Sequence, residues 1–560
     1  MWRRLLWLAC FLLVLFSILL WRATSPTWVE LGQIRTNWPL SERWLIDGYD
    51  INWDVEERRW RVVYGATVIW ETASNKPWLG AALQAAPVTL RNAEQGLTGR
   101  QLQVCARQEW DELQQVGNRV EALGTLYCGD QSFPIQFTIS VDEQRRLVLN
   151  WETSEQVALT YLESPMGAGE QVFGFGIQSI TPSLVGRRVL GRDQLFAPID
   201  SEMPVSAGSD RPFSVYSSHN RGWLIGGTGT RLLDLTRPQR WRLENWSAQG
   251  EVALAAARSP AFLLPRLFPE QEPQEYPDWF GRNPLLPLGG EVAADFWEPL
   301  ARHGAPLSLV VADPAALVDE VGVPEVVGAL VDLPPALDTL AGWREYGLGS
   351  MVSALLSSGL AGDPMSYTIV GGSIEDRGRW RTEPRTQELY LRWLELNTFT
   401  PVLSFHDTLL ASEHYHLWDE DESGHIHAAR LATIHEALWP YRRRLMAAVV
   451  DQNMPMVRPM WLEFPDDPET WQLPPNQYML GPHLLVAPIL QSATLERRVY
   501  LPEGEWTHLW SGREWFSLGQ WIDVVAPMGE PAVFVHDNFP GRAALLNRAH
   551  ELGVSHLMSY

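Results

Sequence analysis

Cysteine, positive charge and long hydrophobic runs are all scarce in this chain of 560 residues. The 44 Lys and Arg side chains face 67 Asp and Glu, so the formal net charge at pH 7 is −23. A surface of this sign repels phosphates, which argues against nucleic acid as a partner. The sequence contains no glycine-rich phosphate loop and no zinc-type spacing of cysteine and histidine, so we expect no nucleotide or metal cofactor.

The one long hydrophobic run lies at the N-terminus. It extends from Leu5 to Trp21 and follows Arg3 and Arg4, the positive flank of a targeting segment. A run of about 17–25 apolar residues can cross a bilayer, and this one ends without the small residues of a cleavage site. We therefore expect an uncleaved signal anchor over residues 1–26, with the rest of the chain on the periplasmic side of an inner membrane. A cleaved signal peptide is the alternative.

Only two cysteines, Cys105 and Cys128, lie outside this run. In an exported protein, the oxidising compartment permits a disulfide between them. Both lie in sequence with a strand pattern, so they could be neighbours across two strands. Two buried free thiols are the alternative, because sequence spacing does not establish the geometry of a disulfide.

Residues 27–288 contain short alternating apolar runs, such as Phe133–Asp142 (FPIQFTISVD), separated by Gly, Pro, Asn and Asp. This pattern predicts antiparallel strands that form a β-sandwich. A proline-rich stretch from Pro265 to Pro287 is expected to mark the end of that domain. The 28 Trp and 14 Tyr side chains could stack on sugars, and the alternative is that they fill the core of the sandwich.

Residues 289–454 alternate between strand and helix patterns, which predicts βα units around a parallel sheet. The expected strands are Leu307–Ala312 and Val326–Val331, and the expected helices are Gly347–Ser358, Thr382–Asn397 and His425–Asn453. A complete (β/α)8 barrel takes about 250 residues, so we expect a shortened barrel. Residues 455–560 return to a strand pattern and are predicted to form a C-terminal β-sandwich with a short helix near the end. The expected fold class is therefore multidomain, α/β plus all-β.

Several segments have distinctive sequences. They are Glu388–Asp407 (ELYLRWLELNTFTPVLSFHD), Pro455–Glu469 (PMVRPMWLEFPDDPE), Gln477–Pro488 (QYMLGPHLLVAP) and, upstream, Phe173–Arg188 (FGFGIQSITPSLVGRR) and Tyr216–Gly226 (YSSHNRGWLIG). Together they resemble glycoside hydrolase family 31, the α-glucosidase and sulfoquinovosidase family. The resemblance implies a mutarotase-like N-terminal β-sandwich, a catalytic barrel and a C-terminal β-sandwich. It also implies retaining hydrolysis of α-glycosidic bonds.

Retaining hydrolysis needs two carboxyl groups about 5 Å apart, one as nucleophile and one as acid/base with a raised pKa. The resemblance places Asp338 on the acid/base position and Trp343 on a tryptophan of the family, within Leu337–Gly362. Asp332, which follows an expected strand, is an alternative acid. Asp338 could instead cap a helix or a turn.

The nucleophile motif of the family, Trp-x-x-Asp-x-Gly-Glu, does not occur in this sequence. Asp313 follows an expected strand and is the nearest candidate. However, Asp313-Pro314 also reads as a helix N-cap followed by proline at the first helical position. The sequence therefore predicts a catalytic centre that lacks at least one of its two carboxylates.

Trp343 and two further positions, Gln178 and His406, are expected to contact substrate by resemblance. Gln178 is retained from a Gly-x-Gly-Glu-Gln motif in which Ile177 replaces the glutamate. His406 is retained from a strand-end Arg-x-His motif in which Ser404 replaces the arginine, although it could also be a structural histidine.

Five other histidines surround an acidic stretch and read as a solvated polar loop rather than a metal site: His414, His416, His425, His427 and His435. Two functions remain open for the chain as a whole. It is a glycosidase that acts on α-linked carbohydrate, or a non-catalytic carbohydrate-binding or scaffold protein of the cell envelope. An internal deletion would also explain the short barrel. The oligomeric state is left open.

Overall fold

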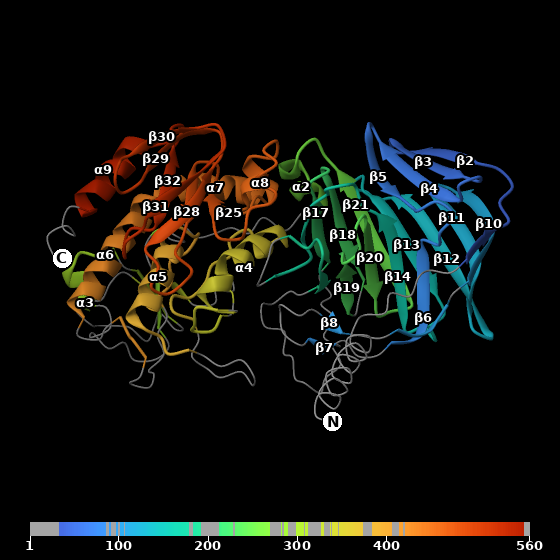
Figure 1. Ribbon diagram of the computed structural model, residues 1–560, viewed down its shortest axis with the longest axis horizontal. Coiled ribbons are helices and arrows are strands. Elements are labelled where there is room, and N and C mark those ends of the chain that lie inside the picture. Colours follow the sequence, from blue (N-terminus) through green and yellow to red (C-terminus); the bar gives the residue numbers. More distant parts are fainter. Residues whose placement is uncertain are drawn as a thin grey trace, which may run out of the picture.

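The computed structural model describes residues 33–85, 89–90, 97–98, 101–105, 107–178, 183–191, 212–227, 230–268, 282, 285–288, 298–306, 308–311, 326–329, 337, 339–344, 346–372, 383–405, 414–417 and 421–553. Figure 1 shows the N-terminal sheets on one side, and the helices with the C-terminal sheets on the other. Where the two halves meet lie α2 (Leu264–Leu267), α4 (Leu348–Leu360) and α8 (Met460–Glu463).

The N-terminal half consists of sheets in which the strands are antiparallel, except for β1, which joins β10 in parallel. The largest sheet contains, in spatial order, β1 (Gln33–Thr36), β10 (Arg107–Val116), β11 (Arg119–Cys128), β12 (Gln131–Val141), β13 (Leu147–Thr153), β21 (Gln249–Ala256), β18 (Arg221–Gly226), β17 (Phe213–Ser217) and β15 (Val172–Gly174). A second sheet contains β16 (Arg188–Leu190), β19 (Arg231–Asp234), β20 (Arg240–Asn245), β14 (Leu159–Pro165), β6 (Leu79–Ala85) and β9 (Gln101–Val104). Smaller sheets are formed by β2 (Glu42–Ile46), β3 (Tyr49–Asp54), β4 (Arg59–Tyr64) and β5 (Thr67–Glu71), and by β7 (Thr89–Leu90) with β8 (Leu97–Thr98).

These strands bury alternate residues, and tryptophan dominates the core that they enclose. In β3, for example, Tyr49, Ile51 and Trp53 are buried while the residues between them are partly exposed. The fully buried tryptophans of this core are Trp53, Trp60, Trp70, Trp78, Trp110 and Trp151. Trp78 and Trp110 stack with their ring centroids 4.9 Å apart. These side chains therefore fill the core and are removed from the set of possible sugar contacts.

Parallel strands follow in the middle of the chain. β22 (Leu285–Leu288), β23 (Ser308–Val311) and β24 (Val326–Ala329) pair in parallel, and β23 and β24 lie within the expected strands. β22 overlaps the end of the proline-rich stretch that the sequence assigns to a domain boundary. Among the described strands it lies at the edge of its sheet, next to β23, and an edge strand tolerates a proline such as Pro287. The closure of these strands into a shortened barrel stays a prediction.

The helices of this region agree in part with the sequence. α4 corresponds to the helix expected at 347–358, and α5 (Gln387–Thr398) to the one expected at 382–397. α5 begins later than expected because Thr386 is its N-cap, with Oγ1 accepting a hydrogen bond from the Leu389 N–H at 3.2 Å. A short helix, α3 (Glu298–Arg302), packs against the helix α6.

The single helix expected over residues 425–453 is wrong. The structure contains two helices, α6 (Glu422–Ala437) and α7 (Trp439–Gln452), separated at Leu438. Pro440 lies in the first turn of α7, where its missing N–H is tolerated, but it cannot continue the hydrogen-bond ladder of α6. Asn453, with a φ of 51°, then ends α7 in the left-handed conformation.

The C-terminal part is antiparallel, as expected. One sheet contains β25 (Val457–Arg458), β26 (Tyr478–Leu480), β27 (Leu484–Ala487), β32 (Ala532–His536), β29 (Gly504–His508) and β30 (Glu514–Ser517), and β28 (Glu496–Leu501) pairs with β31 (Gln520–Val525). The helix α9 (Arg542–Gly553) follows and confirms the short helix expected near the end of the chain.

A buried ion pair joins α5 to this domain. Arg392 Nη1 lies 2.9 Å from a carboxylate oxygen of Glu395, and Arg392 Nη2 donates a hydrogen bond to the Ala526 carbonyl at 3.0 Å. Glu395 in turn accepts a hydrogen bond from the Gly529 N–H at 2.6 Å. The two side chains pair with each other and with the backbone of the C-terminal domain, so they tie α5 to that domain.

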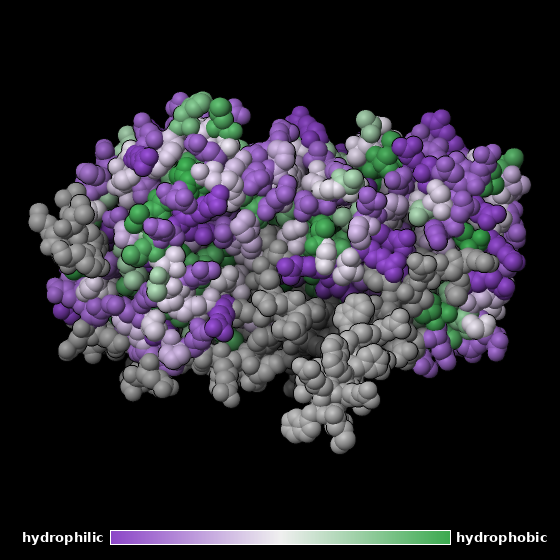
Figure 2. Space-filling view, in the orientation of Figure 1, coloured by the Kyte–Doolittle hydropathy of each residue, from purple (hydrophilic) through white to green (hydrophobic). Residues whose placement is uncertain are grey.

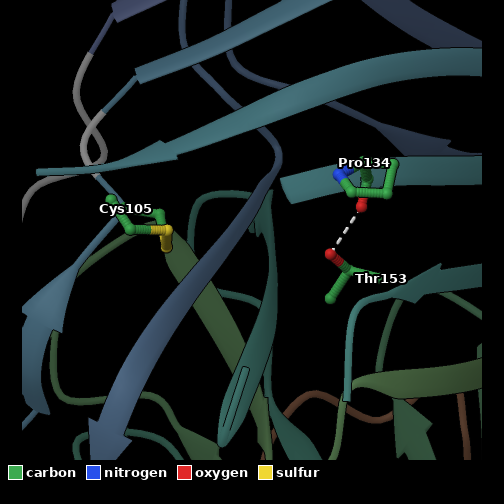
Figure 3. Close-up of a disulfide and its surroundings, with 4 residues drawn as sticks. Cys105, Pro134 and Thr153 are labelled. Carbon is green, nitrogen blue, oxygen red and sulfur yellow. Dashed lines mark hydrogen bonds between the residues drawn. A yellow bond between two sulfur atoms is a disulfide. The ribbon is translucent and has the colours of Figure 1, made fainter. Parts of the chain in front are cut away.

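Cys105 and Cys128 form a disulfide in the structure. Cys105 follows β9 in the second sheet and Cys128 ends β11 in the largest sheet, so the bridge connects the two sheets (Figure 3). Nearby, Thr153 Oγ1 donates a hydrogen bond to the Pro134 carbonyl at 2.6 Å, between β13 and β12.

The expected signal anchor, residues 1–26, lies outside the described residues. Among the helices that the structure describes, none combines the length and the apolar character needed to cross a bilayer. Figure 2 shows hydrophilic residues spread over both halves of the visible face, with smaller hydrophobic areas between them.

Candidate functional site

The candidate site lies where three short segments of the chain pair in parallel. Leu337 pairs in parallel with Thr368, and Ile369 pairs in parallel with Ser404. Parallel strands present their carboxyl ends at the same edge, and that edge is where α/β barrels keep their reactive groups. The chain turns immediately after Ile369, where Gly372 donates its N–H to the Ile369 carbonyl at 3.3 Å.

Glycine is required at this turn for two reasons. Gly371 and Gly372 have φ angles of 85° and 65°, a backbone region that other residues rarely adopt. A Cβ atom at Gly372 would lie 2.8 Å from the carbonyl carbon of Leu340. The turn therefore packs directly on the backbone of the loop that carries Trp343.

The Trp343 loop is held by a carboxylate from a distant segment. Trp343 donates its N–H to Glu383 Oε2 at 3.0 Å, and the Glu383 N–H donates to the Ala341 carbonyl at 2.9 Å. The Trp343 carbonyl accepts the Gly349 N–H at 3.1 Å, which ties the loop to the first turn of α4. The Trp343 side chain is half-buried against the core around α4. The sequence did not identify Glu383, because nothing in its local pattern points to a contact 40 residues away.

Gln178 reaches the same helix from the N-terminal half. Its backbone N–H donates to Ser357 Oγ in α4 at 2.8 Å. Its side-chain amide donates to the carbonyls of Phe175 at 2.9 Å and Leu190 at 3.4 Å. The amide nitrogen therefore holds backbone in place, rather than being free for a substrate. Trp343 and Gln178 are thus brought to opposite ends of one helix.

A buried carboxylate anchors the segment that leads to Gln178. Glu170 is fully buried just before β15, and Arg221 Nη2 lies 2.7 Å from each of its carboxylate oxygens. The Gly167 N–H donates to Glu170 Oε2 at 2.7 Å, and the Ser217 hydroxyl donates to Oε1. Burial alone would raise the pKa of Glu170, but the Arg221 charge and these hydrogen bonds lower it below its ordinary value.

A second group that the sequence did not identify surrounds Arg385, next to Glu383. Arg385 Nε donates to the Tyr415 carbonyl at 2.9 Å, its backbone N–H donates to His414 Nδ1 at 3.1 Å, and Nη2 lies 3.3 Å from His416 Nδ1. Arg385 is almost fully buried and packs beside Gly371. This arginine therefore holds the 414–417 segment against the turn at the strand edge.

The expected solvated histidine loop is wrong. Four of the histidines are buried, namely His416, His425, His427 and His435. Burial lowers the pKa of His427 and lowers that of His435 further, so both favour the neutral form. His435 is fully buried beside the Thr398 carbonyl, 2.9 Å from Nδ1. The histidines look solvated in the sequence because the acidic stretch between them is polar, but α6 turns His425, His427 and His435 towards the core.

Four of the predicted site residues lie outside the described residues: Asp313, Asp332, Asp338 and His406. Their roles therefore stay predictions. Each follows, within a few positions of the sequence, the end of a described parallel strand or bridge position. Among the described residues, no group of three or more His, Cys, Asp and Glu side chains could hold a metal ion.

Comparison with known proteins gives matches over part of the chain. Residues 453–539 match the glycosyl hydrolase family 31 C-terminal domain. The chain is 37% identical to the sulfoquinovosidase of Agrobacterium fabrum over 34% of this chain and 28% of the relative, and 34% identical to the sulfoquinovosidase of Escherichia coli over 34% and 26%. It thus aligns with about a quarter of the length of these relatives.

The fold is similar over a longer range. A family 31 sulfoquinovosidase from E. rectale superposes with a TM-score of 0.69 at 17% identity, over 90% of this chain and 99% of the other. A family 31 dextranase from Flavobacterium johnsoniae superposes with a TM-score of 0.56 at 13% identity, over 91% of this chain and 81% of the other. At these identities the likeness concerns the multidomain, mostly β fold.

Proposed function

Because the chain belongs to glycoside hydrolase family 31, we propose that it binds α-linked carbohydrate at the edge where its parallel strands end, and that it hydrolyses such glycosides slowly or not at all. The observation that carries the proposal is the parallel pairing of Leu337 with Thr368 and of Ile369 with Ser404. Asp338 follows the first of these positions in the sequence, and His406 comes shortly after the last.

The reaction of the family sets the limit on turnover. Hydrolysis with retention needs a nucleophilic carboxylate about 5 Å from the acid/base. Asp338 supplies one carboxyl by resemblance, while the nucleophile motif is absent from the sequence and Asp313 and Asp332 are the remaining candidates. Glu383 is close to the Trp343 loop, but its carboxylate already accepts the Trp343 N–H. Loss of one of two catalytic carboxylates removes the covalent path and costs several orders of magnitude in rate, whereas sugar contacts can persist.

The location of the protein is part of the proposal. The positive flank and apolar run at the N-terminus predict an anchor in the inner membrane, with the carbohydrate site on the periplasmic side. The disulfide between Cys105 and Cys128 agrees with an oxidising compartment. A scaffold role in the cell envelope would use the same location without a carbohydrate ligand.

The proposal is tested by measuring turnover and binding on the same protein. We expect no release of nitrophenol from p-nitrophenyl α-glycosides above the rate of the Asp338→Asn variant. We also expect α-linked oligosaccharides to give a saturable rise in Tm, since a ligand at 100 times its Kd stabilises the folded state by about 2.7 kcal/mol. His406→Ala should reduce the shift, and His550→Ala, on the exposed side of α9, should not.

Two results would change the conclusion. Release of nitrophenol by the wild type that Asp338→Asn abolishes would show an active glycosidase and an unrecognised nucleophile. The absence of any Tm shift across a broad panel of α-glycosides would leave the scaffold role as the better description.

A further inference from the structure

A groove crosses the exposed face of the largest sheet, away from the candidate site. Its volume is about 610 Å³, and binding sites for small molecules have volumes of about 300–1,000 Å³. The floor of the groove is formed by β12, β13, β21 and β18, which lie side by side in the N-terminal half (Figure 1). The other face of these strands is core, where Leu149, Val252 and Ile225 are buried.

The strand register places a polar row along the floor. Thr138 pairs with Asn150, and Asn150 pairs with Glu251, so their side chains stand side by side on one face. The next position is Gly226, opposite Glu251. An added Cβ at Gly226 would lie 3.2 Å from Glu251 Oε1, so glycine leaves room beside that carboxylate. Within the row, Asn150 Nδ2 donates a hydrogen bond to Glu251 Oε2 at 3.4 Å, which holds the two side chains together. The row offers a ligand the remaining hydrogen-bonding capacity of its hydroxyl, amide and carboxylate groups.

An apolar row runs beside the polar one. Val148 pairs with Ala253, and Ala253 pairs with Leu224. The floor therefore combines a flat apolar strip with an adjacent line of hydrogen-bonding groups. A sugar chain presents the same combination, because the C–H faces of its rings are apolar and its hydroxyls are donors and acceptors.

The loop between β12 and β13 forms a preorganised end wall. Asp142 accepts hydrogen bonds from the Arg146 N–H at 2.8 Å and from Arg146 Nε at 2.6 Å. Arg146 Nη1 donates to the Leu267 carbonyl at the end of α2, at 3.2 Å. The wall is fixed before any ligand arrives, which lowers the entropic cost of binding.

The charges of the groove select against anions. Arg119 Nη2 lies 2.7 Å from Glu121, and Arg146 pairs with Asp142, so both cations are already matched. Glu143 and Glu251 pair with no cation among the described residues and leave the groove negative. A sulfated or phosphorylated sugar would be repelled. We propose that this groove is a second carbohydrate site, which binds an uncharged oligosaccharide chain independently of the strand edge.

The test is electrophoresis of the full chain through native gels that contain a soluble polysaccharide. The probes are dextran, pullulan and a soluble β-glucan, with dextran sulfate as the anionic comparison. We expect at least one uncharged glucan to retard the wild type and dextran sulfate not to. Asn150→Ala should weaken the apparent affinity by about fivefold, the equivalent of one hydrogen bond. Ser140→Trp, which places a ring on the groove floor, should abolish the retardation.

The matched control is Glu152→Ala. Glu152 is exposed on the same strand and the same face as Asn150 but does not line the groove, so this variant should migrate like the wild type. The His406→Ala variant should be retarded like the wild type, because His406 belongs to the proposed site at the strand edge and not to the groove. Retardation that His406→Ala removes and Asn150→Ala leaves intact would overturn the second site while keeping the proposed function. Equal effects of Asn150→Ala and Glu152→Ala, or no retardation by any uncharged glucan, would also overturn it.

Discussion

Removal of the Glu170 carboxylate is expected to destabilise the N-terminal half strongly. Glu170 is fully buried, the Arg221 side chain is 9% exposed, and the two form an ion pair at 2.7 Å. Glu170→Ala would leave the Arg221 charge buried without its partner, and the Gly167 N–H and Ser217 hydroxyl without an acceptor.

The size of the effect follows from the cost of an unpaired buried charge. Breaking a buried ion pair by removing one partner costs about 3–5 kcal/mol. The two orphaned donors do not add their full cost, because water can enter the space left by the side chain. We therefore expect a loss of about 4 kcal/mol, which lowers Tm by about 8–16 °C in a domain of this size.

The assay is thermal and urea unfolding followed by tryptophan fluorescence, which reports on the buried tryptophans of this half. Glu152→Ala on β13 is the control and should cost less than about 0.5 kcal/mol, because Glu152 is exposed. The double variant Glu170→Leu with Arg221→Met should recover most of the loss, because it removes both charges together. A Glu170→Ala variant as stable as Glu152→Ala would refute the reasoning.

The pH dependence gives the same prediction an independent check. The pKa of Glu170 is lower in the folded state than its ordinary value, because the charge and hydrogen bonds around it outweigh burial. Its contribution is therefore complete above the unfolded pKa of about 4.3 and is lost as the pH falls towards the folded pKa. The difference in stability between wild type and Glu170→Ala should narrow below about pH 4. A difference that widens there would contradict the assignment.

Three further predictions concern stability. The Cys105–Cys128 bridge has a sequence separation of 23 residues. Replacing both cysteines by serine should therefore lower the free energy of unfolding in urea by about 3 kcal/mol. Dithiothreitol should lower the stability of the wild type and leave that of the double variant unchanged. Thr386→Ala removes the N-cap of α5 and should cost about 1 kcal/mol by calorimetry; Thr386→Ser is the control, and equal stability of the two variants would count against the cap. Burial lowers the pKa of His508 to about 4. The stability that depends on neutral His508 should therefore be lost as the pH falls from about 6.5 towards 4. Parallel curves of unfolding free energy against pH for wild type and His508→Gln would contradict this.

Local pattern in the sequence was sufficient for much of the fold. Alternation with a period of two predicted the strands of both β regions, because one face of each strand must be buried. β23, β24, α4 and α5 lie at or near their expected positions, the two helices because their apolar residues recur with the helical period of 3.6. Because β22 contains Pro287, the sequence predicted a domain boundary there rather than a strand. Pro440 lies in the first turn of a new helix at a point where the apolar pattern alone predicts one continuous helix. In both cases the outcome depends on whether the missing N–H of the proline would have needed a hydrogen-bond partner at that position.

The candidate site was only partly accessible from the sequence. The motif resemblance was enough to point to glycoside hydrolase family 31 and to show that its nucleophile motif is missing from the sequence. It could not show that the Gln178 amide is occupied by backbone carbonyls or that Glu383 accepts the Trp343 N–H. Nor could it show that Glu170 and Arg221 form an ion pair. These contacts join segments far apart in the chain, and no local spacing encodes them.

The sequence by itself determined the alternation of the strands, the excess of negative charge and the family likeness of the chain. The tertiary structure decided that the tryptophans fill a core, that the histidines of α6 are buried, and that the outer face of β12, β13, β21 and β18 forms a groove. The physical reason is that burial and pairing belong to two segments at once. The sequence of one segment determines which side chains and backbone groups are present there. Only the packing of the whole chain determines which of them are buried and which partner each one contacts.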